Sequence, residues 1–382
     1  MKSWSQLYKY KKKRLKIITI KKAGNKKNVL IIYIPWAIKA WMKNKYIEEE
    51  FNGHSMNWES IEMVKCLSAK GYNVDVVDCT RPLPEMEWKK YTLVIDERNN
   101  IKDAPSIAGQ LRIHYATGCQ WLFHNAAEYI RLLDFRRRTG ISIPTQRQIQ
   151  PIFSEEIADY TTYFGGSFQK NLFTHPDKTY PLDLSSAFIP LFKTKEINKS
   201  RKNFLWMGSR GFIHKGLDIV MEAFKNNQNF TLHIFAGLES EPEFYSWFKK
   251  EFSCCSNIVY HGWKNLSDIS FQQLAENCIA TIYCSAAEGG AGAIVQAMQF
   301  GCIPIVNDST ALRGQDTGFF LQGKTPLELI SSINEVFGTI AGMPDQALCE
   351  KSETVRAYAN KNHSRDAYSK SFRQFIDLLE NG

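Results

Sequence analysis

The sequence predicts an α/β protein with two doubly wound domains of comparable size and a helical C-terminal tail. Apolar runs of strand length alternate with helical patterns, which is typical of parallel α/β units. The alternation stops at residues 181–200, a stretch with Pro, Ser and Lys, and then begins again. A chain of 382 residues with 44% hydrophobic residues can form two cores of ordinary size. We divide the chain into residues 1–27, a basic N-terminal arm; residues 28–195 and 200–340, the two α/β domains; and residues 341–382, C-terminal helices expected to pack across the hinge.

The first domain opens with a continuous apolar run that ends at Pro35, which predicts a strand covered on both faces. A helix is expected to end at Gly71, where a C-cap glycine belongs. In a later helix we expect Tyr129, Leu132 and Leu133 to face inward and Arg131 and residues 136–138, all Arg, to face outward. The expected strands are residues 29–34, 72–77 and 91–95, and the expected helices are residues 57–70 and 126–138.

The second domain repeats the alternation. Expected strands are residues 203–207, 230–235, 258–260, 279–283 and 303–306, and expected helices are residues 216–224, 243–252, 267–277 and 291–300. Helical patterns alone follow at residues 327–337, 345–360 and 366–379.

The net charge of +9 comes from the arm. Residues 1–27 contain eleven basic residues and no acidic residue, which leaves 37 basic against 39 acidic residues in the rest of the chain. A nearly neutral body argues against a nucleic-acid-binding protein, since such a domain carries positive charge on its folded surface. The arm mixes Lys clusters with apolar residues, so it suits an anionic membrane surface or, equally, a solubilising tail.

Targeting features are weak. The only apolar run of the arm, residues 17–20, is too short for an export signal, and no transmembrane helix is predicted. The nine cysteines are odd in number and form no Cys-x-x-Cys pair. We therefore expect a cytoplasmic protein with reduced cysteines, peripheral to the membrane if the arm binds lipid.

Two loops in the second domain carry the residues best suited to chemistry. The first, residues 208–216, follows a strand and leads into a helix. Gly208 and Ser209 leave the backbone accessible, while Arg210 and Lys215 place two cations beside a helix start, which suits a diphosphate. A solvated turn with two surface cations would have the same composition.

The second loop, residues 285–293, lies between a strand and the helix that runs to residue 300. Gly289, Gly290, Ala291 and Gly292 predict a cradle of backbone N–H groups without obstructing side chains. Glu288 beside it would repel a bare phosphate but accept hydrogen bonds from sugar hydroxyls. Alternatively, it is a helix N-terminal acid favoured by the macrodipole.

These loops resemble motifs of the retaining nucleotide-sugar glycosyltransferases of family four, which have two Rossmann-like domains facing across a cleft, the GT-B fold. Residues 208–218 are similar to the family's glycine-arginine and lysine-glycine motif, with the same five-residue separation. Residues 288–304 are similar to its E-x7-E block and the glycine-proline strand that follows. The similarity is weak before residue 200 and strong between about residues 204 and 306.

The resemblance implies that the second domain binds a nucleotide sugar and the first an acceptor. Arg210 and Lys215 would bind the diphosphate, Glu288 the sugar hydroxyls, and the glycine-rich loop the phosphate or sugar. The second glutamate of the motif, which usually holds the ribose, is Gln296 in this chain, so its bond to ribose would be weaker.

First-domain candidates are less specific. His54 and Asn57 lie in a plausible acceptor loop, where His54 could carry a proton, or both could only order the loop and cap the next helix. In the family a useful His often follows the strand that corresponds here to residues 111–114. Gln120 or His124 could fall at that position, or His124 could be structural.

The chain has no Asp-x-Asp and no His-x-x-x-His pair, so we expect no metal and no cofactor. The leading interpretation is a metal-independent, retaining hexosyltransferase that acts on a glycan or lipid-linked acceptor in surface polysaccharide biosynthesis. Alternatives are a nucleotide-sugar epimerase, a phosphorylase-like enzyme, and a non-catalytic binding partner of the same fold.

Overall fold

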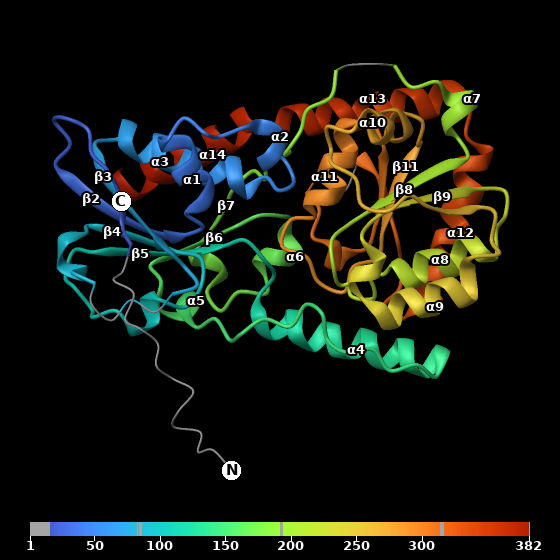
Figure 1. Ribbon diagram of the computed structural model, residues 1–382, viewed down its shortest axis with the longest axis horizontal. Helices are drawn as coiled ribbons and strands as arrows, with labels where there is room; N and C mark the ends of the chain where they lie inside the picture. The colour runs from blue at the N-terminus through green and yellow to red at the C-terminus, as the bar shows by residue number, and fades with distance from the viewer. Residues whose placement is uncertain (1–15, 82, 84–85, 192–193, 314–316, 382) are drawn as a thin grey trace, which may run out of the picture.

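The computed structural model describes residues 16–381 except 82, 84–85, 192–193 and 314–316. Two α/β domains lie side by side, each built around one sheet, and the C-terminal helices run along both (Figure 1). The predicted fold class is confirmed.

The first sheet has seven strands in the order β1-β3-β2-β4-β5-β6-β7. All neighbouring pairs are parallel except β1, which pairs antiparallel with β3 at the edge. The interior strand β2 is continuous and apolar because both of its faces are covered. The strands are β1 (Ile18–Ile20), β2 (Lys27–Tyr33), β3 (Tyr72–Asp78), β4 (Leu93–Asp96), β5 (Leu111–Ala116), β6 (Tyr160–Tyr163) and β7 (Thr179–Pro181).

Strand β1 lies within the segment expected to be a basic arm. Its Thr19 donates a hydrogen bond of 2.6 Å to Asp75 of β3. Residues 18–20 are therefore an edge strand of the first domain, while residues 1–15 of the expected arm lie outside the described residues.

Two of the first-domain helices matter most for the site. The loop at Gly53 leads into α3, and α4 begins where Gln120 accepts hydrogen bonds from the backbone N–H groups of Leu122 and Phe123. This cap starts α4 five residues before the expected position. The helices are α1 (Trp36–Met42), α2 (Glu48–Phe51), α3 (Met56–Ala69), α4 (Trp121–Thr139), α5 (Ser154–Ile157) and α6 (Ser167–Lys170).

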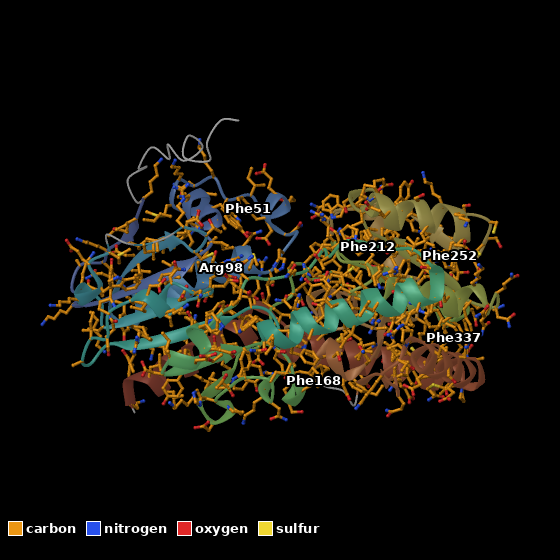
Figure 2. All side chains as sticks on the ribbon, turned by 90° about the horizontal axis from the view of Figure 1, so that it is seen from below. Phe51, Arg98, Phe168, Phe212, Phe252 and Phe337 are labelled. Atoms are coloured by element: carbon orange, nitrogen blue, oxygen red, sulfur yellow. The ribbon has the colours of Figure 1, made fainter. Side chains whose placement is uncertain are left out.

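The expected orientation of α4 is right for Leu132 and for the exposed Arg136 and Arg137, and wrong for the other residues. Tyr129 and Leu133 are 46% and 50% exposed, whereas Arg131 is buried and donates a hydrogen bond of 2.9 Å to the Cys284 carbonyl. Phe135 lies in the core of the second domain, 4.8 Å from Trp247 between ring centroids. The helix extends beneath that domain (Figure 2), so its paired charged residues face the protein and part of its apolar face meets solvent.

The second sheet has six parallel strands in the order β10-β9-β8-β11-β12-β13. The strands are β8 (Asn203–Met207), β9 (Thr231–Phe235), β10 (Ile258–Tyr260), β11 (Ala280–Tyr283), β12 (Ile303–Val306) and β13 (Phe319–Phe320). The helices are α7 (Ile197–Ser200), α8 (Leu217–Lys225), α9 (Pro242–Phe252), α10 (Ile269–Glu276), α11 (Gly292–Gln299) and α12 (Pro326–Gly342).

The last two helices connect the domains. In α13 (Asp345–Asn362), Ser352 donates a hydrogen bond of 2.6 Å to the Gly301 carbonyl of the second domain. In α14 (Arg365–Asn381), Phe372 and Phe375 lie in the first-domain core beside α3. None of the helices in the described part of the chain combines the length and the apolar composition that a membrane span requires.

Candidate active site between the two domains

A cavity of about 330 Å³ lies between the domains, and residues of both line it. In the second domain it lies beyond the carboxyl ends of β8 and β11, where open parallel sheets bind ligands. Of the residues singled out from the sequence, the cavity wall includes His54, His124, Gly208, Ser209, Lys215, Glu288, Gly289, Gly290, Ala291, Gly292 and Gln296.

The loop after β8 delivers Lys215 to the cavity. Gly216 adopts φ +73°, and a Cβ there would lie 2.4 Å from the Cys284 carbonyl oxygen, so only glycine fits. With the loop packed against Cys284 in this way, the Lys215 ammonium forms an ion pair with Glu288, with 2.6 Å between Nζ and Oε1. The two second-domain loops are joined by this pair.

Lys215 and Glu288 form a nearly buried ion pair, with side chains 8% and 13% exposed. Burial tends to raise the pKa of Glu288, but the charges of Lys215 and Arg147 outweigh it and lower the pKa to about 2. Burial lowers the pKa of Lys215, while the carboxylate of Glu288 opposes this. Glu288 is therefore an ionised hydrogen-bond acceptor at neutral pH.

The glycines of the second loop touch the first domain. A Cβ on Gly289 would lie 2.7 Å from Gly118 Cα and from the Thr117 carbonyl oxygen, and one on Gly290 would lie 2.7 Å from Phe164 Cβ. Close approach of the first domain therefore explains these two glycines, in addition to the backbone cradle expected for a ligand. Ala291 adopts φ 55° as the N-cap of α11.

Arg210 does not line the cavity, although its neighbour Ser209 does. Its side chain is exposed, and Nη2 donates a hydrogen bond of 2.6 Å to Gln146 Oε1 of the first domain. The neighbouring residue Arg147 lines the cavity instead. The structure therefore does not bring Arg210 and Lys215 together at the one ligand site that the sequence predicts for both.

Gln296 lines the cavity, but its amide is paired with the protein backbone. Oε1 accepts from Phe188 N at 2.9 Å, and Nε2 donates to the Phe188 carbonyl at 2.6 Å. Both polar atoms of the residue expected to hold ribose are therefore engaged by the segment that links the domains.

His54 faces the cavity, whereas Asn57 does not line it. His54 is accessible to solvent, but partial desolvation between the two domains and the charges of Lys215 and Arg147 lower its pKa, so the neutral imidazole predominates at pH 7. Asn57 accepts a hydrogen bond from Trp36 Nε1 at 2.7 Å and donates one to the Phe51 carbonyl at 2.9 Å. Asn57 orders the loop, and it is not the N-cap, which is Ser55.

Of Gln120 and His124, only His124 lines the cavity. Gln120 caps α4 and donates to Glu155 at 2.8 Å, outside the cavity wall. His124 lines the cavity, donates through Nε2 to the Arg147 carbonyl at 2.8 Å and packs on His214 with ring centroids 4.5 Å apart. Burial lowers the pKa of His124.

One group in the described part of the chain could hold a metal ion. His124, Glu128 and His214 are buried, and their ligand atoms lie within 4.8 Å of one another. His214 donates through Nε2 to the Ala287 carbonyl at 2.8 Å, and burial lowers its pKa to about 3. The expectation of a metal-free enzyme stays a prediction.

Sequence reasoning missed Arg147 and the aromatic part of the wall. Arg147 lies in a polar segment between Pro144 and Pro151 that has no helical or strand periodicity and matches no motif. Further lining residues that were not singled out are Phe164, Phe235, Trp263, Lys264, Phe271 and Tyr283.

Two parallel-sheet domains with a cavity between them define a GT-B fold, and comparison with solved structures agrees. Sucrose-phosphate synthase of Thermosynechococcus elongatus is similar at 11% identity and a TM-score of 0.58, over 93% of this chain and 100% of that one. HepE of Anabaena, solved with UDP and glucose, is similar at 13% identity and a TM-score of 0.55, over 94% and 100%. The match to TarM covers 76% of this chain but only 55% of the length of TarM. Its identity is 11% and its TM-score is 0.49.

At the sequence level, residues 189–337 match the family described as glycosyl transferases group 1. The matched segment contains the six strands of the second sheet and both cavity loops. No curated protein matches the chain.

Proposed function

We propose that this protein is a glycosyltransferase that moves a hexose unit from a nucleoside-diphosphate sugar to an acceptor hydroxyl with retention of configuration. The observation that carries the proposal is the buried Lys215–Glu288 pair in the interdomain cavity, where the two glycine-bearing loops meet. The match of this domain to glycosyl transferases group 1 and the GT-B fold support it.

The pair suits both halves of such a donor. Lys215 would stabilise the negative charge that develops on the departing diphosphate, the largest electrostatic demand of the reaction. Glu288, ionised and fixed by Lys215, would accept hydrogen bonds from the hydroxyls of the sugar. Lys215 holds Glu288 at Oε1, so Oε2 is the oxygen available to the sugar.

Retention would follow from attack on the same face as departure. The bond from the sugar anomeric carbon to the diphosphate oxygen breaks, the acceptor oxygen bonds that carbon, and the acceptor proton passes to the departing phosphate. No protein base is then required. This agrees with the neutral His54, which would contact the acceptor without carrying charge.

The donor nucleotide and the acceptor are proposed from two further observations. HepE, with the same fold, was solved with UDP and glucose, so UDP-sugars are the first donors to try. A glycan or lipid-linked acceptor of surface polysaccharide assembly rests on the resemblance of the two loops to family four. Binding of the basic residues that precede strand β1 to an anionic membrane would bring the enzyme to such an acceptor.

The test is nucleoside-diphosphate release from UDP-, GDP- and ADP-sugars in the presence of candidate acceptors, with the anomeric configuration of the product read by NMR. We expect release that requires the acceptor and that is lost in Lys215→Ala and Glu288→Ala. The exposed pair Lys225 and Glu251, 3.5 Å apart in the same domain, offers matched control variants. Unchanged transfer in both cavity variants would refute the assignment of the site.

A non-catalytic binding protein is the second candidate, favoured by one observation: the amide of Gln296 is engaged by the Phe188 backbone. Such a protein would be stabilised thermally by a nucleotide sugar without releasing nucleoside diphosphate. An epimerase would convert the donor without an acceptor.

A further inference from the structure

The cavity contains a cation of the first domain that no motif assigns. We propose that Arg147, and not Arg210, is the second cation that binds the diphosphate, so that the two domains hold the ligand's phosphates jointly. The inference rests on the proposed function and names a residue that its motifs do not contain.

Arg147 lies close enough to Glu288 to lower the pKa of that carboxyl, but it forms no direct ion pair among the described residues. Lys215 is paired with Glu288 at 2.6 Å, and Lys264 with Asp268 at 3.4 Å. None of the ion pairs found among the described residues includes Arg147, and its Nε is buried without a hydrogen-bond partner. A guanidinium in this state can bind an anion with two parallel N–H donors, the geometry that phosphate groups accept.

The first domain fixes the backbone of Arg147. Its N–H donates to Glu128 Oε1 at 2.7 Å, and its carbonyl accepts from His124 Nε2 at 2.8 Å. Both partners lie one turn apart on α4 and are buried. This explains why a carboxylate and an imidazole are buried at this boundary, since together they hold the segment that bears the arginine.

The second domain makes room for the side chain. Gly211 adopts φ +91°, and a Cβ there would lie 2.3 Å from Cγ and 2.7 Å from Cδ of Arg147. The stem of Arg147 therefore crosses directly over the second-domain loop on its way to the cavity. Gly211 lies within the loop that supplies Lys215, so one loop positions both cations.

Each of the two arginines points toward the other domain. Arg210 of the second domain donates a hydrogen bond to Gln146 Oε1 of the first domain. Arg147, which follows Gln146 in the first domain, lines the cavity. If the phosphates contact Arg147, then closure of the two domains completes the site. Ligand binding would consequently depend on the interface at Gly211.

The test is calorimetric titration of the full chain with UDP, GDP and ADP and with the matching nucleosides. The variants are Arg147→Ala, Arg147→Lys and Arg210→Ala, each checked for a native thermal transition. We expect Arg147→Ala to weaken the best diphosphate about ten- to hundredfold, as for the loss of a charge-assisted hydrogen bond, and to leave the nucleoside unchanged. Arg147→Lys should recover part of the loss, and Arg210→Ala should stay within about twofold of the parent.

Three outcomes would overturn the inference. Either a larger loss in Arg210→Ala than in Arg147→Ala, or an equal loss for nucleoside and diphosphate, would remove Arg147 from the phosphate site. Wild-type protein that binds none of the three diphosphates would refute the proposed function itself, and the inference with it. Should Arg147→Ala fail to fold, Arg147→Lys and Gly211→Ala, which displaces the stem, would measure the same dependence.

Discussion

The two domains contribute to the cavity in different ways. The second domain supplies its wall largely from two continuous loops, residues 208–216 and 285–293, each between a strand and a helix. The first domain supplies two short runs, residues 53–55 and 117–119, and single residues such as Arg147 and Phe164, all from segments far apart in the sequence. A continuous loop with several site residues leaves a motif in the sequence, whereas a surface assembled from short and distant pieces does not.

The two parts of the cavity wall also differ in whether the family match covers them. The match to glycosyl transferases group 1 covers residues 189–337 and so includes only the second-domain wall. If that wall binds the part of the donor that related enzymes share, its residues should carry the largest effects on transfer. Substitutions in the first-domain wall should then change the affinity for the ligand and the contact between the domains more than the rate of the transfer step.

The largest effect is expected for Lys215→Ala. It removes the cation from the departing diphosphate and leaves Glu288 charged and without its partner, so transfer should fall about 10²–10³-fold. The measurement is the initial rate of acceptor-dependent nucleoside-diphosphate release. Lys225→Ala, which breaks an exposed pair, should retain the parent rate. A Lys215→Ala rate within a few-fold of the parent would place the catalytic centre elsewhere.

The next effect concerns stability. Glu288→Gln or Lys215→Met alone leaves one buried charge unpaired, which should cost about 3 kcal/mol of the free energy of unfolding. The double variant leaves neither charge and should be more stable than either single variant. Urea unfolding of the four proteins measures this. Strictly additive losses would show that the two side chains do not interact.

The fold and the second-domain site could be read from the sequence for a physical reason. Buried parallel strands such as β8 and β11 are continuous apolar runs, and the loops that follow them carry Lys215 and Glu288 at fixed spacings. Strands β6 and β7 escaped notice because they are short and contain Thr and Tyr, without a long apolar run. Their positions depend on pairing across the sheet.

The face of α4 was misjudged for a related reason. Apolar Tyr129 and Leu133 were expected inside, but this helix contacts a second domain that offers carbonyl and carboxylate partners. Arg131 and Arg138 then face the protein because each finds a partner there, Arg131 at the Cys284 carbonyl and Arg138 at Asp218. Helical periodicity identifies a helix, but it does not reveal which side the rest of the chain will cover.

A smaller effect should appear where the two walls touch. Gly289→Ala places a Cβ 2.7 Å from Gly118 Cα and from the Thr117 carbonyl oxygen, so the first-domain loop must move. We expect a loss of about 1–3 kcal/mol in stability and a weaker affinity for the donor. Gly292→Ala is the matched control, because its nearest contact would lie at 3.9 Å. Equal behaviour of both variants in thermal unfolding would show that the two domains do not meet at Gly289.

The smallest effect is expected from metal removal. Arg147 and Lys215 supply positive charge to the cavity from opposite domains, so the departing diphosphate should need no divalent ion, and dialysis against EDTA should leave the rate unchanged. The buried group of His124, Glu128 and His214 also bridges the two domains, and each imidazole donates through Nε2 to a backbone carbonyl, which leaves Nδ1 unprotonated. Loss of activity on dialysis, with recovery on addition of Zn²⁺ or Mn²⁺, would instead make that group a metal site. In that case the first domain, through His124 and Glu128, would take part in the reaction as well as in ligand binding. The EDTA measurement therefore decides whether the two domains differ in their role in the reaction.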